Sequence, residues 1–296
     1  MNQTVKGFIY IAIATCAFGT IPVVAKLAIL SGGNETTTLL SRFAIVTIFF
    51  LIYMKWKGLS WRVERRQFYA LLFLGFVAYS NVALLFFLAM RHITPAIGEL
   101  ILYTYPAMVA ILAFFFLGEK LTRVKLLAIC IAFTGCSLVL WAPVDKISLL
   151  GVVFAFLTGF AYAVYIVGNK KVLEGVHPVV ATAYMGACCM IFFFVYGLIT
   201  GTLDFYYNPQ IIMVILIMAF WCTITGILCF FKGMMILGAV KASVISTFEP
   251  VFTIILSFIL LGHGISLVQL VGGGLILSSV LVMQLGDRKT RLPALD

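Results

Sequence analysis

The chain has 296 residues, of which 64% are hydrophobic and only 10% are charged, and its mean hydropathy is +1.17. A soluble domain is roughly half apolar and about a quarter charged, so the excess apolar surface of this chain must face lipid. The formal net charge of +10 would suit a nucleic-acid binder, but the basic residues lie in short loops between apolar runs, which indicates membrane orientation instead.

Ten segments are long and apolar enough to cross the hydrocarbon core, which takes about 20 mostly apolar residues. In chain order they are 7–30, 36–54, 68–90, 95–117, 123–141, 149–169, 178–200, 210–236, 240–262 and 266–285. The loops between them are short, so we expect no soluble domain, and a short polar tail, 287–296, follows the last span. The sequence therefore predicts an all-α integral membrane protein with ten transmembrane helices.

The basic residues are distributed unevenly between the two sides of these spans. If the N-terminus is cytoplasmic, the outer loops hold Lys26, Arg91 and Lys146. The inner segments hold Lys6, Lys55, Lys57, Arg62, Arg65, Arg66, Lys120, Arg123, Lys125, Lys170, Lys171, Lys241, Arg288, Lys289 and Arg291. Since lysine and arginine favour the cytoplasmic side, this bias predicts a multi-pass protein of the cell membrane, in bacteria the inner membrane, with both termini in the cytoplasm.

Four ionisable side chains fall within spans, where a charge costs about 2.5–3.5 kcal/mol at the helix centre on insertion scales and usually faces a cavity or a partner. Arg42 in the second span is expected to reach the interface or to form an ion pair. Glu99 in the fourth span either lines the outer side of a pathway or pairs with Arg42. Lys232 in the eighth span either neutralises Glu249, holds a substrate carboxylate, or extends to the inner interface. Glu249 in the ninth span is either a proton-accepting or amine-binding carboxylate or a structural one.

Polar and aromatic groups at middle depth complete the candidate set. Tyr79, Ser80 and Asn81 lie in the third span, Tyr105 in the fourth, Tyr162 and Tyr165 in the sixth, and Trp221, Thr223 and Thr225 in the eighth. A cavity with apolar walls and a few oriented polar groups is typical of small-molecule sites. We predict that Glu249, Lys232, Tyr79, Asn81, Tyr105, Trp221, Thr225 and Glu99 bind a substrate, although packing remains the alternative for any single aromatic residue. Pro250 has no N–H and frees a backbone carbonyl near Ser246, which creates either a polar spot or only a kink.

Several other chemistries have no support in the sequence. All seven cysteines fall inside apolar runs, and the three histidines lie at loops or span ends, so we expect no metal site. Ser80 and Asn81 have no histidine nearby to act as a base, and we expect no enzyme. No Walker motif is present, and the run 272–274 of three glycines indicates close helix packing. We therefore expect no cofactor.

The sequence matches itself when it is shifted by 144 residues. The matches include Gly7 with Gly151, Lys26 with Lys170, Thr38 with Thr182, Phe86 and Phe87 with Phe230 and Phe231, Met90 with Met234, and Pro106 with Pro250. We infer two repeats, 1–145 and 146–286, of five spans each. Because five is odd, the second repeat enters the membrane from the opposite side, which gives the inverted repeat that recurs in secondary transporters.

The equivalent segments TYPAMVAILAFFFLGEKLT (Thr104–Thr122) and TFEPVFTIILSFILLGHGIS (Thr247–Ser266) resemble the repeat signature of EamA-type transporters of the drug/metabolite transporter superfamily. The resemblance covers roughly 7–285. It implies ten helices, a central cavity between the halves, and export of amino acids or related metabolites. One departure is that the Leu-Gly-Glu ending at Glu119 becomes Leu-Gly-His, ending at His263, in the second repeat.

These observations together predict a secondary transporter that exports small metabolites, amino acids or related compounds, by alternating access. Proton coupling is left open. The alternative is a passive channel or facilitator for small solutes. The expected partners are a small-molecule substrate and the lipid bilayer, with a proton as an optional co-substrate and no nucleic acid, and the expected assembly is a monomer or weak dimer.

Overall fold

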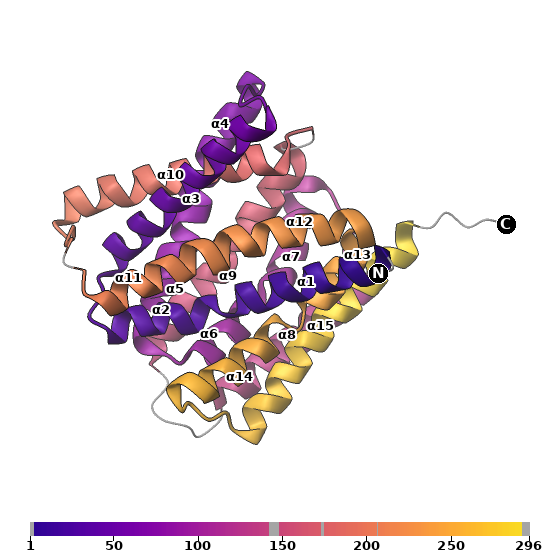
Figure 1. The fold of residues 1–296 in the computed structure, drawn as a ribbon. Coiled ribbons are helices and arrows are strands. Elements are labelled where there is room, and N and C mark those ends of the chain that lie inside the picture. The colour runs from indigo at the N-terminus through magenta and orange to yellow at the C-terminus, as the bar shows by residue number, and fades with distance from the viewer. Residues whose placement is uncertain (1–2, 142–147, 173–174, 206, 292–296) are drawn as a thin grey trace.

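The computed structural model describes residues 3–141, 148–172, 175–205 and 207–291, without the side chains of 170–172, 239–240 and 284–291, and these residues form a helical bundle (Figure 1). The first repeat contains α1 (Gln3–Gly19), α2 (Ile21–Leu30), α3 (Glu35–Lys57), α4 (Arg65–Phe73), the π-helical segment η1 (Leu74–Tyr79), α5 (Ser80–His92), α6 (Pro95–Leu102), α7 (Tyr105–Leu117) and α8 (Arg123–Trp141). The second contains α9 (Leu149–Val172), α10 (Pro178–Thr200), α11 (Pro209–Leu216), the π-helical segment η2 (Ile217–Thr225), α12 (Gly226–Leu237), α13 (Ala239–Ser246), α14 (Glu249–Leu261) and α15 (Leu267–Arg291).

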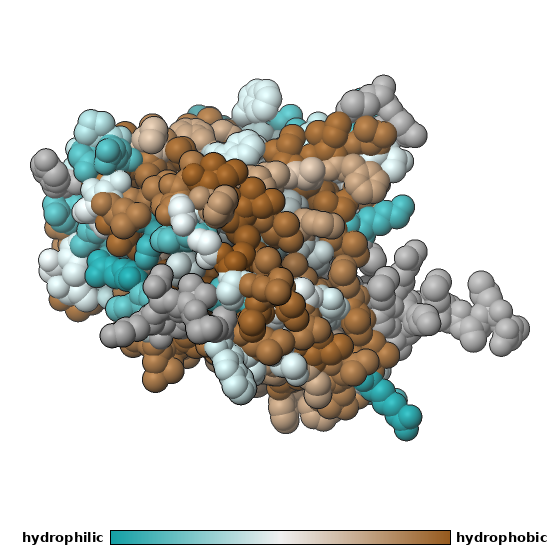
Figure 2. Space-filling view, turned by 90° about the horizontal axis from the view of Figure 1, so that it is seen from below, coloured by the Kyte–Doolittle hydropathy of each residue, from teal (hydrophilic) through white to brown (hydrophobic). Residues whose placement is uncertain are grey.

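Nine continuous helical stretches within the described residues are long and apolar enough to cross a membrane. The tenth predicted span falls on α15, whose apolar part Leu267–Met283 is shorter. Large apolar side chains such as Phe115, Ile199 and Ile259 are at least two thirds exposed. Figure 2 shows a continuous brown surface across the middle of the bundle, with teal residues gathered towards its ends. The predicted all-α, multi-pass membrane architecture is confirmed.

The contacts between helices repeat when the two halves are exchanged. α1 packs along α12, and the equivalent α9 packs along α5. Two further pairs, α3 with α10 and α8 with α15, each join a helix to its own equivalent in the other half, and α6 of the fourth span packs against α14 of the ninth, the equivalent span. This pattern is that of a pseudo-two-fold axis through the bundle, and the shared seam lies between α1, α5, α6, α9, α12 and α14.

The start of α1 and the end of α15 lie at the same end of the bundle (Figure 1), as an even number of crossings requires. Two basic residues assigned to the opposite end are engaged there. Lys26 donates to the carbonyl oxygen of Met90, 2.6 Å away, at the C-terminal end of α5, and Arg91 forms an ion pair with Glu35. The third, Lys146, lies outside the described residues.

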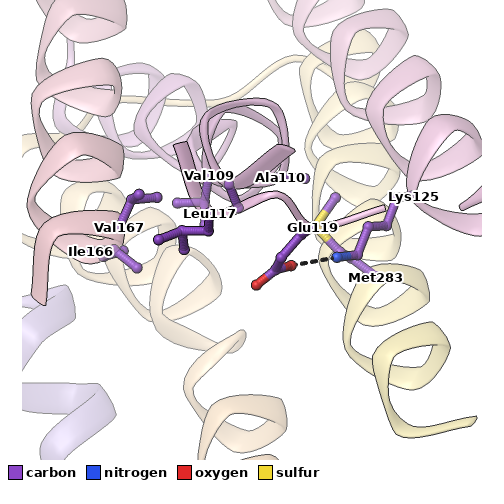
Figure 3. A pocket seen from close by; sticks show the side chains of 9 residues that line it. Val109, Ala110, Leu117, Glu119, Lys125, Ile166, Val167 and Met283 are labelled. Atoms are coloured by element: carbon purple, nitrogen blue, oxygen red, sulfur yellow. Dashed lines mark hydrogen bonds and ion pairs between the residues drawn. The ribbon is translucent and has the colours of Figure 1, made fainter. Parts of the chain in front are cut away.

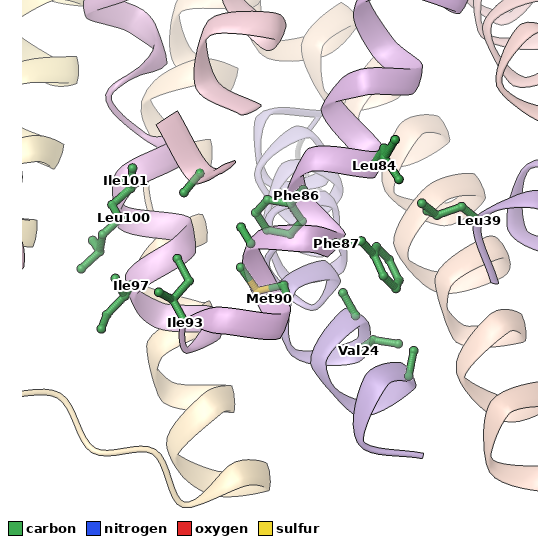
Figure 4. Packing of buried hydrophobic residues seen from close by; sticks show 14 of the residues in the cluster. Val24, Leu39, Leu84, Phe86, Phe87, Met90, Ile93, Ile97, Leu100 and Ile101 are labelled. Carbon is green, nitrogen blue, oxygen red and sulfur yellow. The ribbon is translucent and has the colours of Figure 1, made fainter. Parts of the chain in front are cut away.

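The largest cluster of buried apolar side chains fills the bundle beside the seam (Figure 4). It joins Leu39 of α3, Phe87 and Met90 of α5, and Leu100 of α6. The same cluster includes Val139 of α8 and Ile276 of α15, and these two helices approach so closely that a Cβ added at Gly272 would lie 2.6 Å from the carbonyl oxygen of Gly135. The predicted role of the glycine run in close helix packing is confirmed at Gly272.

Candidate functional site

The fourth and ninth spans are each broken near their middle. The fourth is interrupted between α6 and α7 at Tyr103, and the ninth between α13 and α14 at Thr247. Pro106 and Pro250 stand at the second positions of α7 and α14. Each proline lacks the N–H that would bond the carbonyl four residues earlier, so the breaks leave polar backbone at the seam, as in the discontinuous helices of many transporters.

A cavity of about 450 Å³ opens at the seam between the two repeats. Its lining comes from both halves and mixes apolar, aromatic, hydroxyl and charged side chains. The polar and charged members are Arg42, Tyr79, Glu99, Tyr103, Tyr105, Thr158, Tyr162, Tyr165, Thr182, Thr223, Ser243, Ser246, Thr247 and Glu249. A volume of this size fits a small metabolite.

Two carboxyl groups, Glu99 and Glu249, face the cavity from opposite repeats. Glu249 is the first residue of α14, where the positive end of the helix dipole favours a carboxylate. The Tyr103 hydroxyl donates toward Glu249 Oε2, 2.9 Å away, and toward the Ser246 carbonyl oxygen, 3.0 Å away. The Ser246 carbonyl is the group that Pro250 leaves without an N–H partner, so the predicted polar spot exists and a tyrosine of the other repeat occupies it.

Arg42 is 5% exposed and lines the same cavity. Its Nε donates to Thr223 Oγ1, 3.0 Å away, and its guanidinium lies over the Phe43 ring, 5.2 Å from the centroid. Thr223 in turn donates to the carbonyl oxygen of Met218, five residues earlier, within the π-helical segment η2. The ion pair between Arg42 and Glu99 that the sequence suggested is wrong, because the described residues contain no such contact.

Five tyrosines form a continuous wall of the cavity, here called the tyrosine row: Tyr79, Tyr165, Tyr162, Tyr105 and Tyr103. The successive ring centroids are 5.0, 6.0, 4.8 and 5.9 Å apart along that order. Tyr79 also packs edge-on against Phe43, at 6.2 Å. The row therefore runs from the neighbourhood of Arg42 to the hydroxyl that contacts Glu249.

Four of the eight predicted substrate-binding residues line the cavity: Glu249, Glu99, Tyr79 and Tyr105. The other four do not.

Asn81 donates to the carbonyl oxygen of Val77, 2.7 Å away, within its own helix. Trp221 donates to Thr20 Oγ1, 3.2 Å away. Lys232 lies with its Nζ 5.6 Å from the centre of the Tyr10 ring. Thr225 is partly buried outside the cavity lining.

Sequence reasoning gave too little weight to Arg42 and Tyr103. Arg42 was placed at an interface or in an ion pair, although a charge within a span is itself the signal for a cavity. Tyr103 was not selected. Its signal is its place in the helix break before Pro106, next to Tyr105.

A second, smaller pocket of about 100 Å³ lies beside the loop between α7 and α8 (Figure 3). Its walls are apolar except for Glu119 and Lys125, whose carboxylate and ammonium are 2.9 Å apart. The glutamate of the Leu-Gly-Glu ending thus braces the start of α8. Because its charges already face each other, this pocket is the poorer site for a charged ligand.

The described residues contain no group of three or more histidine, cysteine or acidic side chains that could hold a metal ion. The groups that the seam offers are hydroxyl groups, aromatic faces, one guanidinium and two carboxyl groups.

The comparison with protein families gives one match, found twice. The model of the EamA-like transporter family matches residues 5–141 and again residues 149–285. The uncharacterized transporter YyaM of Bacillus subtilis is 28% identical over 246 residues, which cover 80% of this chain and 79% of that protein. YcbK, an uncharacterized transporter of the same organism, is 24% identical over 312 residues, covering 98% and 96%.

Similarity extends to an archaeal protein and to a solved structure. An uncharacterized transporter of Archaeoglobus fulgidus is 25% identical over 218 residues, covering 71% of this chain and 74% of that protein. Among the solved structures that match, a crystal structure has a TM-score of 0.68 and 15% identity, covering 98% of this chain and 99% of the other. At this identity the structural match shows the fold alone.

Proposed function

Because the chain belongs to the EamA-like transporter family, we propose that it is a secondary transporter that exports a small metabolite, an amino acid or related compound, by alternating access. The observation that carries the proposal is the cavity at the seam, which both repeats line and in which charged groups of both signs are buried. A buried charge is costly unless a partner compensates it, so the cavity is suited to a polar cargo.

The mechanism follows from the equivalence of the two halves. Each half contributes a broken helix to the seam, α6–α7 from the first and α13–α14 from the second. If the halves exchange conformations, the packing that closes one end of the cavity is transferred to the other end, and the cargo site opens to each side in turn. The bias of basic residues favours termini in the cytoplasm, and for export the substrate enters the cavity from that same side.

A proton is the proposed co-substrate. Glu99 and Glu249 are close enough to interact electrostatically, and both lie in the cavity where a proton and a cargo ammonium group would compete for them. Exchange of a proton for cargo at this pair would couple export to the proton gradient.

Saturable counterflow in liposomes that contain only the purified protein is the test of transport. The amino acid is chosen because it stabilises the protein against heat. Liposomes loaded with an excess of the unlabelled amino acid should transiently accumulate the labelled form from the outside. A passive channel would instead give flux that does not saturate and no counterflow, and that result would replace the carrier by the alternative.

Glu249→Gln tests the proton step. We expect a changed rate and a changed pH dependence of counterflow, whereas Glu35→Gln, which removes a carboxylate in an ion pair outside the cavity, should leave the pH profile of the wild type. Wild-type uptake by Glu249→Gln at every pH would remove Glu249 from the mechanism.

A further inference from the structure

The cavity carries opposite charges at its two ends. The Arg42 guanidinium lies over the Phe43 ring, which packs against Tyr79 at one end of the tyrosine row. At the other end, the hydroxyl of Tyr103, next to Tyr105 in the row, donates toward Glu249. Between Tyr79 and Tyr105, the tyrosine row continues through Tyr165 and Tyr162. The guanidinium and the two carboxyl groups are therefore separated along the cavity by a wall of aromatic rings.

Both ends have hydrogen-bonding capacity that the protein leaves unused. Arg42 and Glu99 both line the cavity. Arg42 Nε donates to Thr223, and its two Nη atoms, like the carboxyl oxygens of Glu99, make no hydrogen bond within the described residues. A charged group that faces an enclosed cavity without a partner is costly. A ligand that supplies an anion at one end and a cation at the other would satisfy both.

The pseudo-two-fold symmetry provides an internal control for this chemistry. The positions equivalent to Tyr162 and Tyr165, 144 residues earlier, are Phe18 and Ile21, and both also line the cavity. The position equivalent to Arg42 is Gly186. Since the same fold accepts apolar or small residues at these places, packing does not demand the hydroxyls or the guanidinium.

We infer that the cargo is a linear ω-amino acid, with its carboxylate on Arg42, its ammonium group between Glu99 and Glu249, and its methylene chain along the tyrosine row. Arginine and carboxylate form strong, bidentate hydrogen bonds, and tyrosine faces attract both methylene groups and ammonium ions. The inference rests on the proposed transport function and specifies its substrate class.

The separation of charges is what distinguishes this class from ordinary amino acids. In an α-amino acid a single carbon joins the ammonium and carboxylate groups, so the molecule cannot contact both ends of the cavity at once. An ω-amino acid of five or six carbons places several methylene groups between its charges. Lysine should bind less well than its des-amino counterpart, because its α-ammonium group would lie beside Arg42.

The helix break before Pro106 offers a further candidate acceptor for the ammonium group. Pro106 has no N–H for the carbonyl of Leu102, and Leu102 lines the cavity. At the second break, the corresponding carbonyl of Ser246 already accepts from Tyr103. An ammonium group has three donors, which two carboxyl groups and this carbonyl can accept.

Two isomers of the same composition provide the test. 6-Aminohexanoate and norleucine (2-aminohexanoate) have the same atoms and the same charges and differ in the separation of those charges. Calorimetric titration of the purified full-length protein in detergent should give at least about tenfold tighter binding of 6-aminohexanoate. Equal or tighter binding of norleucine, or no binding of 6-aminohexanoate, would overturn the inference.

Two variants then assign the ends. Arg42→Gln should weaken 6-aminohexanoate to the level of hexylamine while leaving hexylamine unchanged, and Glu99→Gln should weaken both. Tyr53→Phe removes a hydroxyl outside the cavity. It serves as the control for a substitution away from the site and should bind 6-aminohexanoate as the wild type does. An Arg42→Gln variant that remains monodisperse and still binds 6-aminohexanoate at full affinity would contradict the assignment.

Counterflow separates failure of this inference from failure of the proposed function. If norleucine binds more tightly and shows saturable counterflow, transport stands and the substrate class is wrong. If 6-aminohexanoate binds but neither it nor any other stabilising compound shows saturable counterflow, the site is real and the transport function is wrong.

Discussion

Replacing Gly272 by alanine should force α15 away from α8. The new Cβ would lie 2.6 Å from the carbonyl oxygen of Gly135 and 2.9 Å from the backbone nitrogen of Val139. Ordinary contact begins at 3.4 Å, so the first distance is too short by the difference, 0.8 Å. Both obstacles are backbone atoms, which cannot rotate aside as a side chain would. Overpacking of this kind typically costs about 1–3 kcal/mol.

Gly274 offers a matched control two residues away on the same helix. A Cβ at Gly274 would meet nothing within 4 Å, and alanine is favoured over glycine within a helix by about 1 kcal/mol. Gly274→Ala should therefore raise the unfolding temperature of the purified protein in detergent, whereas Gly272→Ala should lower it. If the two substitutions shift the unfolding temperature in the same direction by similar amounts, the close approach of α8 and α15 is not real.

Three further substitutions test other contacts. Tyr103→Phe should lower stability by about 1–3 kcal/mol, because the buried carboxyl of Glu249 loses a donor; an unchanged unfolding temperature would argue against that bond. Lys125→Met should destabilise more than the double variant with Glu119→Gln, since the single change leaves the partner carboxylate unpaired in a partly buried place; additive effects would speak against the pair. Asn208→Ala should lower the free energy of unfolding by about 1 kcal/mol, because the Asn208 side chain caps the start of α11. An unchanged unfolding temperature in scanning calorimetry would contradict this role.

The apolar spans could be predicted because lipid imposes length and apolarity on a crossing helix, and nine of the ten predicted ones meet that criterion within the described residues. The two-fold repeat could be predicted because the halves match at one constant offset. The effect of Pro250 could also be predicted, since the missing N–H acts locally: the Ser246 carbonyl four residues earlier is free for another donor. The identity of that donor, Tyr103, could not be predicted, because it comes from the other repeat and depends on how the halves meet.

The main property that could not be predicted is which side chains of each span point into the cavity. Tyr79 and its equivalent Thr223 line the cavity, whereas Asn81 and its equivalent Thr225, each two residues further on, do not. With about 3.6 residues per turn, positions two apart point to nearly opposite sides. Spans that are apolar all round show no periodicity from which to choose the side.

The π-helical turns make the problem harder. η1 ends at Tyr79 and η2 spans Thr223, so both cavity-facing residues lie in segments whose turns hold an extra residue. Such a turn rotates every later side chain relative to an ordinary helix, and π turns are frequent at functional sites. The π-helical turns occur at equivalent places in the two repeats. They are therefore a shared feature of both halves at the seam and not the effect of one local residue.

The two repeats are alike in backbone and unlike in side-chain chemistry, and the two properties have different uses. Exchange of conformations needs equivalent breaks and equivalent packing, which Pro106 and Pro250 supply. Binding an asymmetric molecule needs unequal ends, which the guanidinium of Arg42 and the carboxyl groups of Glu99 and Glu249 supply. A cavity that kept the symmetry in its chemistry would bind its cargo equally well in either direction. In the proposed transporter, the unequal ends would hold the cargo in one orientation in both the inward- and outward-open states.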